Sequence, residues 1–405
     1  MNNQKTVFVC LGSLGVGEAA QGLTIAQELT RKGEVAHCLI SPASAAVFRG
    51  SGVSHEVFPE SFLPMLPEYI REFVGSGRDA SVCICDLFAH NGLFEKRSLE
   101  WSEFSNIGAS LFAIDTWGFS TGDACIDLID KEPKHLSRWP LDNMTLLAPV
   151  PFTWTTNDCL RFNSLPPKNR PSSRTIRHLR TALDLSESQK LVLFCSAPWQ
   201  HVEFESNIVR SMAAQIPVLA IQECLSISPD IKVVHAGPQA FAGLIDERRY
   251  LWLDAQKIEE FDVLLASADL LLSLNYSART ITRAMMLEVP VLLAVSDCRL
   301  PNAGDCFERT NDYDWIQRLG TFAPYQVWPL GFSRVVKRLR EGNPYDSTMT
   351  ICDLSDRESL RESIAYSLFD DDVRRRLDAR RADFLRVATS LPTGGELIAA
   401  ARVAP

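Results

Sequence analysis

Short apolar runs alternate with amphipathic segments along most of the chain, and this alternation constrains the fold more than any other feature. In the first 150 residues, runs typical of strands lie at 6–11, 34–40, 53–58, 81–86 and 108–115. The alternation restarts later, with runs at 191–196, 218–221, 231–237, 250–253, 269–274 and 289–295. Strands that alternate with helices are typical of a parallel sheet covered on both faces. The sequence therefore predicts an α/β protein with two domains of the same kind.

The boundary between the two halves is marked by prolines. Five of them fall within 23 residues: Pro149, Pro151, Pro166, Pro167 and Pro171. Proline clusters fit poorly inside helices or central strands, so we interpret this stretch as an interdomain connection, with a long loop inside one domain as the alternative. We expect an N-terminal domain over 1–165 and a C-terminal domain over 176–370. Charged helices are predicted over 356–369 and 371–387, and a return of the segment 371–405 to the N-terminal domain is one alternative.

Composition excludes several classes of protein. Fifty acidic residues against 41 basic ones give a formal charge of −9, which argues against nucleic-acid binding and binding to anionic membranes. The eleven cysteines form no C-x-x-C pair, and several lie inside strand-like runs (Cys10, Cys83, Cys85, Cys195). They are interpreted as buried thiols in a reducing compartment, not as disulfides or zinc ligands. No apolar run reaches the roughly 18 residues of a membrane span, and the first strand begins too early for a signal peptide. We expect a cytoplasmic protein.

A glycine-rich loop follows the first strand. Gly12, Gly15 and Gly17 precede a helix with apolar residues at helical spacing (Ala19, Leu23, Ala26, Leu29), and Gly33 offers a stop. The loop matches the looser dinucleotide fingerprint, but the second strand ends at Ser41 and Pro42 without the acidic residue that binds ribose, which argues against a nicotinamide dehydrogenase.

Glu18 opens this first helix. A carboxylate there can act as general base toward a substrate hydroxyl, or it can simply complement the helix dipole. The dipole favours the ionised form while burial would disfavour it, and the sequence does not rank the two effects on its pKa.

A second strand–loop–helix unit spans 269–290. Ser277 is the expected N-cap of its helix, in which Ala278, Ile281, Ala284 and Met285 face inward. The helix start with Arg279 and Thr280 predicts either an anion site or an ordinary capped helix.

Together these features resemble the GT-B glycosyltransferases, in particular the nucleotide-sugar-dependent enzymes of the plant and macrolide type and of the MurG type. The resemblance covers most of the chain, with degraded motifs. It implies two Rossmann-like domains facing each other across a cleft, with the nucleotide sugar mainly on the C-terminal domain and the acceptor mainly on the N-terminal one.

The resemblance implies donor-binding residues in the C-terminal half. Counting back from Pro290, Asn275 falls at the family's histidine, Ser277 at a glycine and Thr280 at a diphosphate-binding hydroxyl residue, while Glu288 replaces the glycine before Val-Pro. With the segments near the base and phosphates added, the implied donor contacts are Ser196, Ala197, Gly237, Leu253, Asp254, Asn275, Ser277, Ala278, Arg279 and Thr280. His235 and Ala236 end a strand on the same rim.

In the N-terminal half, Gly17-Glu18 falls where the MurG-type pattern has Gly-His. The resemblance therefore implies that Glu18 takes the place of the catalytic histidine, with the loop of Gly15 and Gly17 on the acceptor side. Asp86 resembles the family's aspartate at the end of the fourth strand. His90 and Asp115 follow strand ends on the same face as alternative base or acceptor contacts.

The predicted function is transfer of a sugar from a nucleotide-diphosphate sugar to a hydroxyl or amine of a small-molecule, natural-product-like acceptor. No cofactor and no metal are expected, because helix-end amides and Arg279 can carry the charge of the leaving group. The protein is expected to be a monomer or homodimer. The alternatives are an inactive glycosyltransferase-like auxiliary protein, favoured by the lost glycines and histidine, and a GT-B sugar-nucleotide epimerase.

Overall fold

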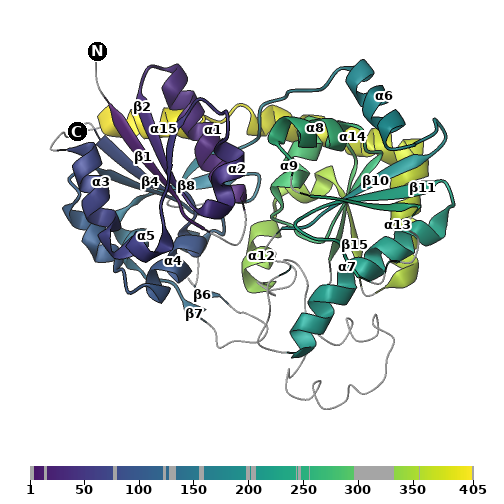
Figure 1. Cartoon of the computed structure of the whole chain (residues 1–405), viewed down its shortest axis with the longest axis horizontal. Coiled ribbons are helices and arrows are strands. Elements are labelled where there is room, and N and C mark those ends of the chain that lie inside the picture. The colour runs from purple at the N-terminus through teal and green to yellow at the C-terminus, as the bar shows by residue number, and fades with distance from the viewer. Residues whose placement is uncertain are drawn as a thin grey trace. The chain divides into compact units, whose positions relative to one another are not determined.

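The structure is a computed structural model, and it describes residues 4–12, 16–75, 80–121, 125–126, 134–154, 159–197, 201, 207–242, 244, 248–254, 256–295, 333–354 and 356–403. The chain divides into two compact units (Figure 1). Unit 1 is formed by the described residues of Met1–Ile126, Lys134–Leu165 and Val387–Pro405, and unit 2 by those of Pro166–Arg386.

Unit 1 contains a seven-stranded parallel sheet in the order β3-β2-β1-β4-β5-β8-β9. Its strands are β1 (Lys5–Cys10), β2 (Val35–Ile40), β3 (Ser54–Val57), β4 (Ala80–Ile84), β5 (Ser110–Ile114), β8 (Thr145–Val150) and β9 (Leu160–Asn163). The five strands expected in the first 150 residues are confirmed. A short antiparallel ribbon, β6 (Cys125–Ile126) with β7 (Lys134–His135), lies outside this sheet.

The proline-rich stretch is only partly a connection. The chain passes from unit 1 to unit 2 between Leu165 and Pro166, but β8 and β9 both belong to the sheet of unit 1. Pro149 is accommodated because it lies beyond Leu147, the last β8 residue paired with β5. β9 is an edge strand, and Pro166, Pro167 and Pro171 come after it in the chain, so they interrupt none of its hydrogen bonds to β8.

The helices of unit 1 are α1 (Gly17–Arg31), α2 (Ala45–Phe48), α3 (Leu66–Val74), α4 (Leu87–Lys96), α5 (Trp139–Asn143) and α15 (Gly394–Val403), with 3-10 turns η1 (Pro42–Ser44), η2 (Glu60–Met65), η3 (Trp101–Asn106) and η4 (Phe119–Thr121). α1 confirms the expected helix: Ala19, Leu23, Ala26 and Leu29 are buried. The chain leaves it through Gly33, whose φ of 83° favours glycine.

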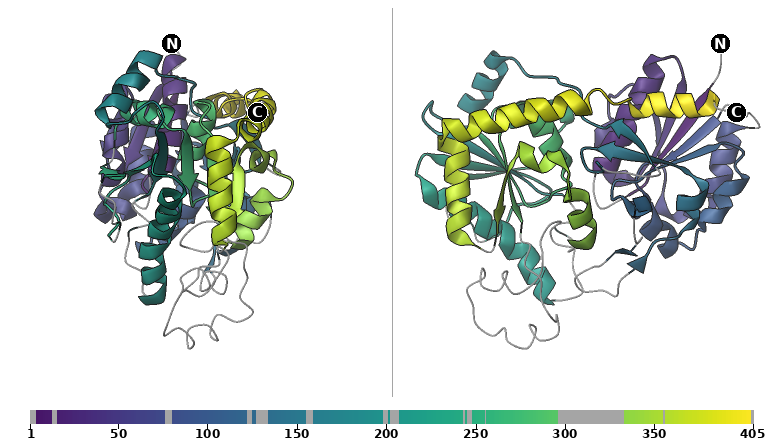
Figure 2. Two further views of the ribbon diagram at one scale, coloured as in Figure 1. Left: turned by 90° about the vertical axis from the view of Figure 1, so that its right-hand side faces the viewer. Right: turned by 180° about the vertical axis from the view of Figure 1, so that it is seen from behind.

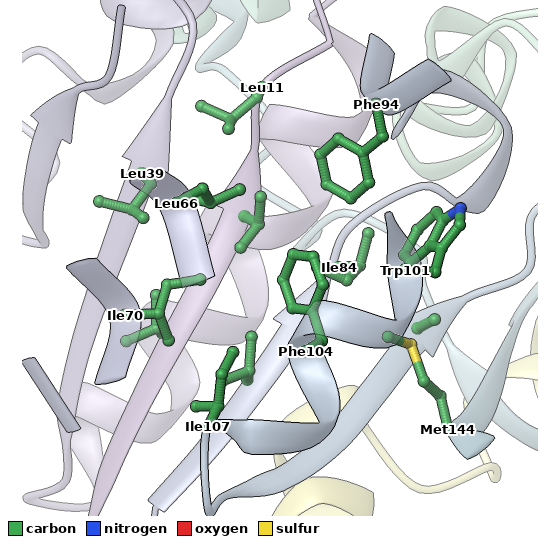
Figure 3. Close-up of a cluster of buried hydrophobic side chains, with 14 of the residues drawn as sticks. Leu11, Leu39, Leu66, Ile70, Ile84, Phe94, Trp101, Phe104, Ile107 and Met144 are labelled. Atoms are coloured by element: carbon green, nitrogen blue, oxygen red, sulfur yellow. The ribbon is translucent and has the colours of Figure 1, made fainter. Parts of the chain in front are cut away.

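The sheet of unit 1 is covered on both faces, which explains its continuous apolar runs. Val7 and Val9 of β1 pack with α3, α4 and η3 in one buried cluster (Figure 3). Phe8 and Cys10 point to the opposite face and pack with α1, α2 and Ile398 of α15 in a second cluster. Side chains of one strand thus alternate between two cores.

The last helix of the chain completes unit 1 (Figure 2). α15 packs against α1 and β9, and the Gly395 amide donates a hydrogen bond of 3.2 Å to the carboxylate of Glu28. Arg402 is almost fully buried and forms an ion pair of 2.7 Å with Glu34. Its guanidinium also donates to the hydroxyls of Ser81, at 2.7 Å, and Thr6. The C-terminal segment is therefore an integral part of the first domain.

Unit 2 contains a six-stranded parallel sheet in the order β12-β11-β10-β13-β14-β15. Its strands are β10 (Lys190–Cys195), β11 (Ile231–Ala236), β12 (Tyr250–Leu253), β13 (Leu270–Ser273), β14 (Val291–Val295) and β15 (Thr350–Asp353). Its helices are α6 (Ser173–Ala182), α7 (Asn207–Ile227), α8 (Ile258–Ala266), α9 (Arg279–Met286), α12 (Ser333–Arg340), α13 (Arg357–Phe369) and α14 (Asp371–Ala388), with the 3-10 turn η6 (Pro344–Thr348).

The strand expected at 218–221 is wrong, because these residues lie inside α7. A buried helix carries the same continuous apolar sequence as a buried strand, and Ala220 and Ile221 pack in the core beside β10 and α13. Glu223 of α7 is also buried and forms ion pairs with Arg357, at 2.5 Å, and Arg361 of α13. The remaining strands expected in this half and the two charged helices after residue 356 are confirmed.

Replacing Arg402 by Met should destabilise unit 1, because the Glu34 carboxylate, 11% exposed, would lose its ion-pair partner. Breaking a buried pair typically costs about 3 kcal/mol or more. We expect a loss of that size in the free energy of unfolding of unit 1, together with faster hydrogen exchange of the α15 amides. The matched control is Arg386→Met, which breaks an exposed pair with Asp383 and should cost less than about 1 kcal/mol. Equal effects of the two substitutions would contradict the assignment.

Candidate functional sites at the carboxyl edges of the two sheets

Glu18 lies against Gly12, the residue that leads out of β1. A Cβ built on Gly12 would stand 2.2 Å from Oε1 of Glu18, so only glycine allows the carboxylate this close to the backbone. Gly17, predicted on the acceptor-side loop, is the first residue of α1, and Gly15 lies outside the described residues. The Oε1 atom of Glu18 is shielded from solvent and has no hydrogen-bond partner among the described residues. A buried oxygen of this kind is ready to accept a hydrogen bond from a ligand.

Burial raises the pKa of Glu18 well above its ordinary value, and the nearby charge of Asp86 raises it further. A hydrogen bond from the Gly12 amide acts in the opposite direction, but its effect is smaller. Desolvation is thus the largest of these effects on the pKa of Glu18. A carboxyl group with a raised pKa is a stronger base toward a hydroxyl than an exposed glutamate.

Asp86 is the N-cap of α4, and its Oδ1 accepts a hydrogen bond of 3.0 Å from the Ala89 amide. Burial raises its pKa to about 6, although hydrogen bonds from Ala89 and from the Thr116 hydroxyl lower it. The charge of Asp115 adds to the increase. Asp86 thus combines a structural capping role with an electrostatic effect on Glu18.

The side chains of His90 and Asp115 are held by hydrogen bonds to other residues of unit 1. The Leu11 amide donates to Nε2 of His90 at 3.1 Å, and Nδ1 of His90 lies 2.7 Å from the backbone oxygen of Asp86, to which it donates. Burial lowers the pKa of His90 to about 4, so the ring is neutral. Asp115 accepts hydrogen bonds from the amides of Phe119 and Ser120 and from the Ser120 hydroxyl. Both side chains hold the loops that follow β1, β4 and β5, which leaves Glu18 as the better candidate for a base.

In unit 2, parallel pairing brings several predicted donor residues together at one edge of the sheet. The Ser196 amide donates to the Ala236 oxygen at 3.0 Å, and the Gly237 amide donates to the Leu253 oxygen at 3.1 Å. The indole of Trp252 donates to the Gly237 oxygen at 2.9 Å. Ala197 and Asp254 are the next residues along two of these strand ends.

Two histidines complete this edge. Nε2 of His235 lies 2.7 Å from the Ser196 hydroxyl oxygen, and Nε2 of His201 lies 2.8 Å from the same atom. A Cβ on Gly237 would stand 2.1 Å from that oxygen, so the arrangement requires glycine there. Sequence reasoning placed His235 only at a strand end and missed His201, because the sequence around His201 shows no hydrophobic periodicity. Its one sequence signal is its place shortly after the end of β10.

The start of α9 differs in detail from the expectation. Ser277 is not the N-cap: that position is occupied by Ala278, and the helix begins at Arg279. The hydroxyl and amide of Ser277 instead both donate to Oδ1 of Asn275, each at 3.0 Å. Asn275 thus closes a local turn with Ser277, and the residue at the N-cap position has no side chain that bonds a helix amide. Thr280 is the second residue of the helix.

Glu288 lies where the resemblance to GT-B glycosyltransferases implies a glycine, just before Val289 and Pro290. Its φ is 63°, in the left-handed region, and its carboxylate is held by Lys168, at 2.8 Å, and Arg170. These cations lower the pKa of Glu288, the hydrogen bond from Lys168 contributing most. Glu288 thus has a backbone conformation that glycine adopts without strain, and two ion pairs hold its side chain.

Two general features of the described residues bear on the site. No three His, Cys, Asp or Glu side chains among them are grouped as ligands of a metal ion. None of the helices in the described part of the chain has the length and apolar character needed to cross a membrane.

Comparison with known proteins places the chain in a family. A family model described as a family of unknown function, DUF6365, matches residues 25–404. The chain belongs to the DUF6365 family. No curated protein matches this DUF6365 chain by sequence.

The fold of this DUF6365 protein is that of the GT-B glycosyltransferases. It is similar to HepE of Anabaena in complex with UDP and glucose, with a TM-score of 0.56, 13% identity and 98% of each chain covered. It is also similar to UGT2 of Phytolacca americana complexed with UDP-2-fluoro-glucose and pterostilbene, with a TM-score of 0.53, 13% identity, and 99% of this chain and 100% of that chain covered. A third likeness is to the spinosyn rhamnosyltransferase SpnG complexed with thymidine diphosphate, with a TM-score of 0.51, 14% identity, and coverage of 98% and 99%. The fold expected from the sequence is confirmed.

Glu18→Gln should make the DUF6365 protein more stable at alkaline pH. Because the pKa of Glu18 is raised in the folded state, its contribution to stability is present below its ordinary value of 4.5 and is lost as the pH rises through the raised value. The amide cannot ionise, so we expect the free energy of unfolding of Glu18→Gln, relative to that of wild type, to be higher at pH 8 than at pH 4. Urea denaturation at both pH values measures it, with the exposed first-turn glutamate of α3 in Glu68→Gln as control. Parallel pH profiles for wild type and Glu18→Gln would contradict the burial argument.

Proposed function

We propose that this DUF6365 protein is a glycosyltransferase that moves a sugar from a nucleotide-diphosphate sugar to a hydroxyl or amine of a small-molecule acceptor. The observation that carries the proposal is the buried carboxylate of Glu18, whose Oε1 has no partner among the described residues and which opens the first helix of a GT-B fold. Support also comes from the similar structures: SpnG is complexed with thymidine diphosphate, HepE with UDP and glucose, and UGT2 with UDP-2-fluoro-glucose and pterostilbene.

In the proposed reaction, Glu18 accepts the proton of the acceptor group as its oxygen or nitrogen attacks the anomeric carbon. The bond from that carbon to the diphosphate oxygen breaks, and the nucleoside diphosphate leaves with the electron pair. Burial and, to a smaller extent, the charge of Asp86 raise the pKa of Glu18, which makes its carboxylate a better proton acceptor than an exposed glutamate. The reaction as proposed uses no cofactor besides the sugar nucleotide.

Unit 2 is proposed to bind the leaving diphosphate. The first amides of α9 have no intrahelical acceptor and the helix dipole favours an anion there. Arg279 adds a full positive charge at the same helix start. The residues proposed to contact the donor are Ser196, Ala197, Gly237, Leu253, Asp254, Asn275, Ser277, Ala278, Arg279 and Thr280.

Arg279→Ala should weaken binding of nucleoside diphosphates, because a charge-assisted hydrogen bond to phosphate would be lost. Such bonds contribute about 1.5–3 kcal/mol, which corresponds to roughly a 10- to 150-fold rise in Kd. Titration calorimetry with uridine and thymidine diphosphates measures it. Arg177→Ala, which removes an exposed arginine of α6, controls for net charge. An affinity within twofold of wild type in Arg279→Ala would refute the assignment.

Glu18→Gln should lower turnover by roughly 10²–10⁴-fold and leave donor affinity nearly unchanged, because it keeps the shape of the side chain and removes the base. Release of nucleoside diphosphate from a panel of uridine- and thymidine-diphosphate sugars with phenolic and macrolide acceptors gives the rate. Glu68→Gln, at the first turn of α3, is the matched control. If Glu18→Gln keeps more than about a third of the turnover while chemistry is rate-limiting, Asp86 becomes the candidate. If wild type binds donor but transfers no sugar to any acceptor, the inactive auxiliary protein is the better description.

A further inference from the structure

Ser196 lies at the centre of a chain of hydrogen bonds formed by five side chains near the carboxyl ends of β10 and β11, one of them from Tyr250, the first residue of the neighbouring strand β12. Its hydroxyl oxygen is within 2.7 and 2.8 Å of two imidazole nitrogens, Nε2 of His235 and Nε2 of His201. A serine hydroxyl has one hydrogen to donate and two lone pairs that accept. The direction of each hydrogen bond therefore depends on which ring nitrogens carry hydrogen.

The partner of His235 on its far side is Tyr250. Nδ1 of His235 lies 2.8 Å from the Tyr250 hydroxyl, and the oxygen of that hydroxyl already accepts a hydrogen bond of 3.3 Å from the Phe241 amide. The phenolic hydrogen is then available for Nδ1. A neutral imidazole that accepts at Nδ1 carries its hydrogen on Nε2. His235 therefore donates to Ser196.

The partner of His201 on its far side is Gln239. The amide nitrogen of Gln239 lies 3.0 Å from Nδ1 of His201, and an amide nitrogen only donates. His201 consequently also carries its hydrogen on Nε2 and donates to Ser196. Burial lowers the pKa of both histidines, that of His235 to about 3, which keeps both rings neutral.

Packing holds the two imidazoles in these orientations. The ring of Phe241 stacks on His235 at a centroid distance of 4.5 Å and on His201 at 5.2 Å. Gly237 leaves the space that the serine oxygen fills. A rotation of either ring would break its contact with Phe241 as well as two hydrogen bonds.

We propose that His201 and His235 are positioning residues that occupy both lone pairs of Ser196, so that its hydroxyl hydrogen points to a bound ligand and recognises an anionic oxygen of a phosphate. The identity of the ligand as a nucleoside diphosphate rests on the proposed function; the direction of the hydrogen bonds does not. Ser196 is only partly buried, so its hydrogen can reach a ligand. A hydroxyl that accepts two hydrogen bonds is polarised and becomes a better donor.

The same geometry argues against a nucleophilic role of Ser196. A serine 2.7 Å from an imidazole resembles the pair used in acyl transfer, where the histidine removes the serine proton. An Nε2 that already carries hydrogen cannot accept that proton. Burial also makes His235 a weak base at any physiological pH.

The direction of the hydrogen bonds is tested on the free protein by ¹⁵N–¹H correlation spectra of the imidazoles, assigned by loss of signals in His201→Gln and His235→Gln. We expect both rings as the Nε2–H tautomer. Gln239→Glu, which replaces a donor by an acceptor of equal size, should give His201 a hydrogen on Nδ1. An Nδ1–H tautomer for either ring in wild type would overturn the proposal, whether or not the protein transfers sugars.

The role toward phosphate is tested by calorimetry with uridine and thymidine diphosphates, inorganic pyrophosphate and the parent nucleosides. Tyr250→Phe removes the donor to His235 and should weaken diphosphate binding about tenfold, with no change for the nucleosides. Tyr366→Phe, at an exposed site, is the matched control. In the Ser196→Ala background, Tyr250→Phe should have no further effect.

His235→Gln, whose amide can still donate to Ser196, should retain most of the affinity that His235→Leu loses. Additive effects of Tyr250→Phe and Ser196→Ala would overturn the proposed coupling. If both rings are Nε2–H tautomers but none of the phosphate compounds binds, the proposed recognition of a phosphate oxygen by Ser196 is wrong. Covalent labelling of Ser196 by a fluorophosphonate would instead show a nucleophile.

Discussion

The parallel pairing of β1 with β4 is the interaction on which the candidate base depends. The ladder continues past the strand ends, where the Cys85 amide donates to the Val9 oxygen at 3.0 Å and the Leu11 amide donates to the ring of His90 at 3.1 Å. These two bonds fix the backbone immediately before Gly12, and Gly12 in turn lies against the carboxylate of Glu18. A side chain at the head of α1 is thereby held by a strand sixty residues further along the chain.

If Glu18 is the base, as proposed, its electrostatics differ from those of a histidine at the same position. A histidine is neutral when it is ready to accept a proton, and a nearby aspartate stabilises the cation that forms. A glutamate is charged when it is ready, and the nearby aspartate then destabilises it. In this chain the charge of Asp86 adds to burial in raising the pKa of Glu18. Holding two carboxyl groups near each other disfavours the state in which both are ionised.

Sequence patterns predicted the central strands well because strands such as β1, β4 and β10 are buried on both faces, and their apolar runs are therefore unbroken. The same kind of run caused the error at residues 218–221, since this part of α7 packs against the core and is just as apolar. The prolines between residues 149 and 171 concealed β8 and β9. β9 is an edge strand, whereas β8 is paired on both sides, and Pro149 is tolerated in β8 because it lies beyond Leu147, the last β8 residue paired with β5.

Sequence reasoning could place Glu18 and Arg279 at the starts of their helices, and the structure has both there, but their proposed chemical roles stay predictions. The hydrogen bond from Ser277 to Asn275 depends on the turn between them, and no residue pattern encodes it. The ranking of effects on the pKa of Glu18 needed its burial, and His201 needed its contact with Ser196. Each of these findings depends on how close two residues lie in space, and their separation along the chain does not determine that distance.

The return of the last helix to unit 1 has a consequence for the way the polypeptide acquires its structure. α15 supplies Ile398 to a core made otherwise from the first 165 residues, and Arg402 neutralises Glu34, nearly 370 positions away. Closing so long a loop is slow compared with local folding. During synthesis, unit 2 has nearly all of its residues before the final helix leaves the ribosome, whereas unit 1, although made first, must wait for it. The older half of the nascent chain is thus the last to become complete, and until then its exposed core face is a surface for chaperones to protect.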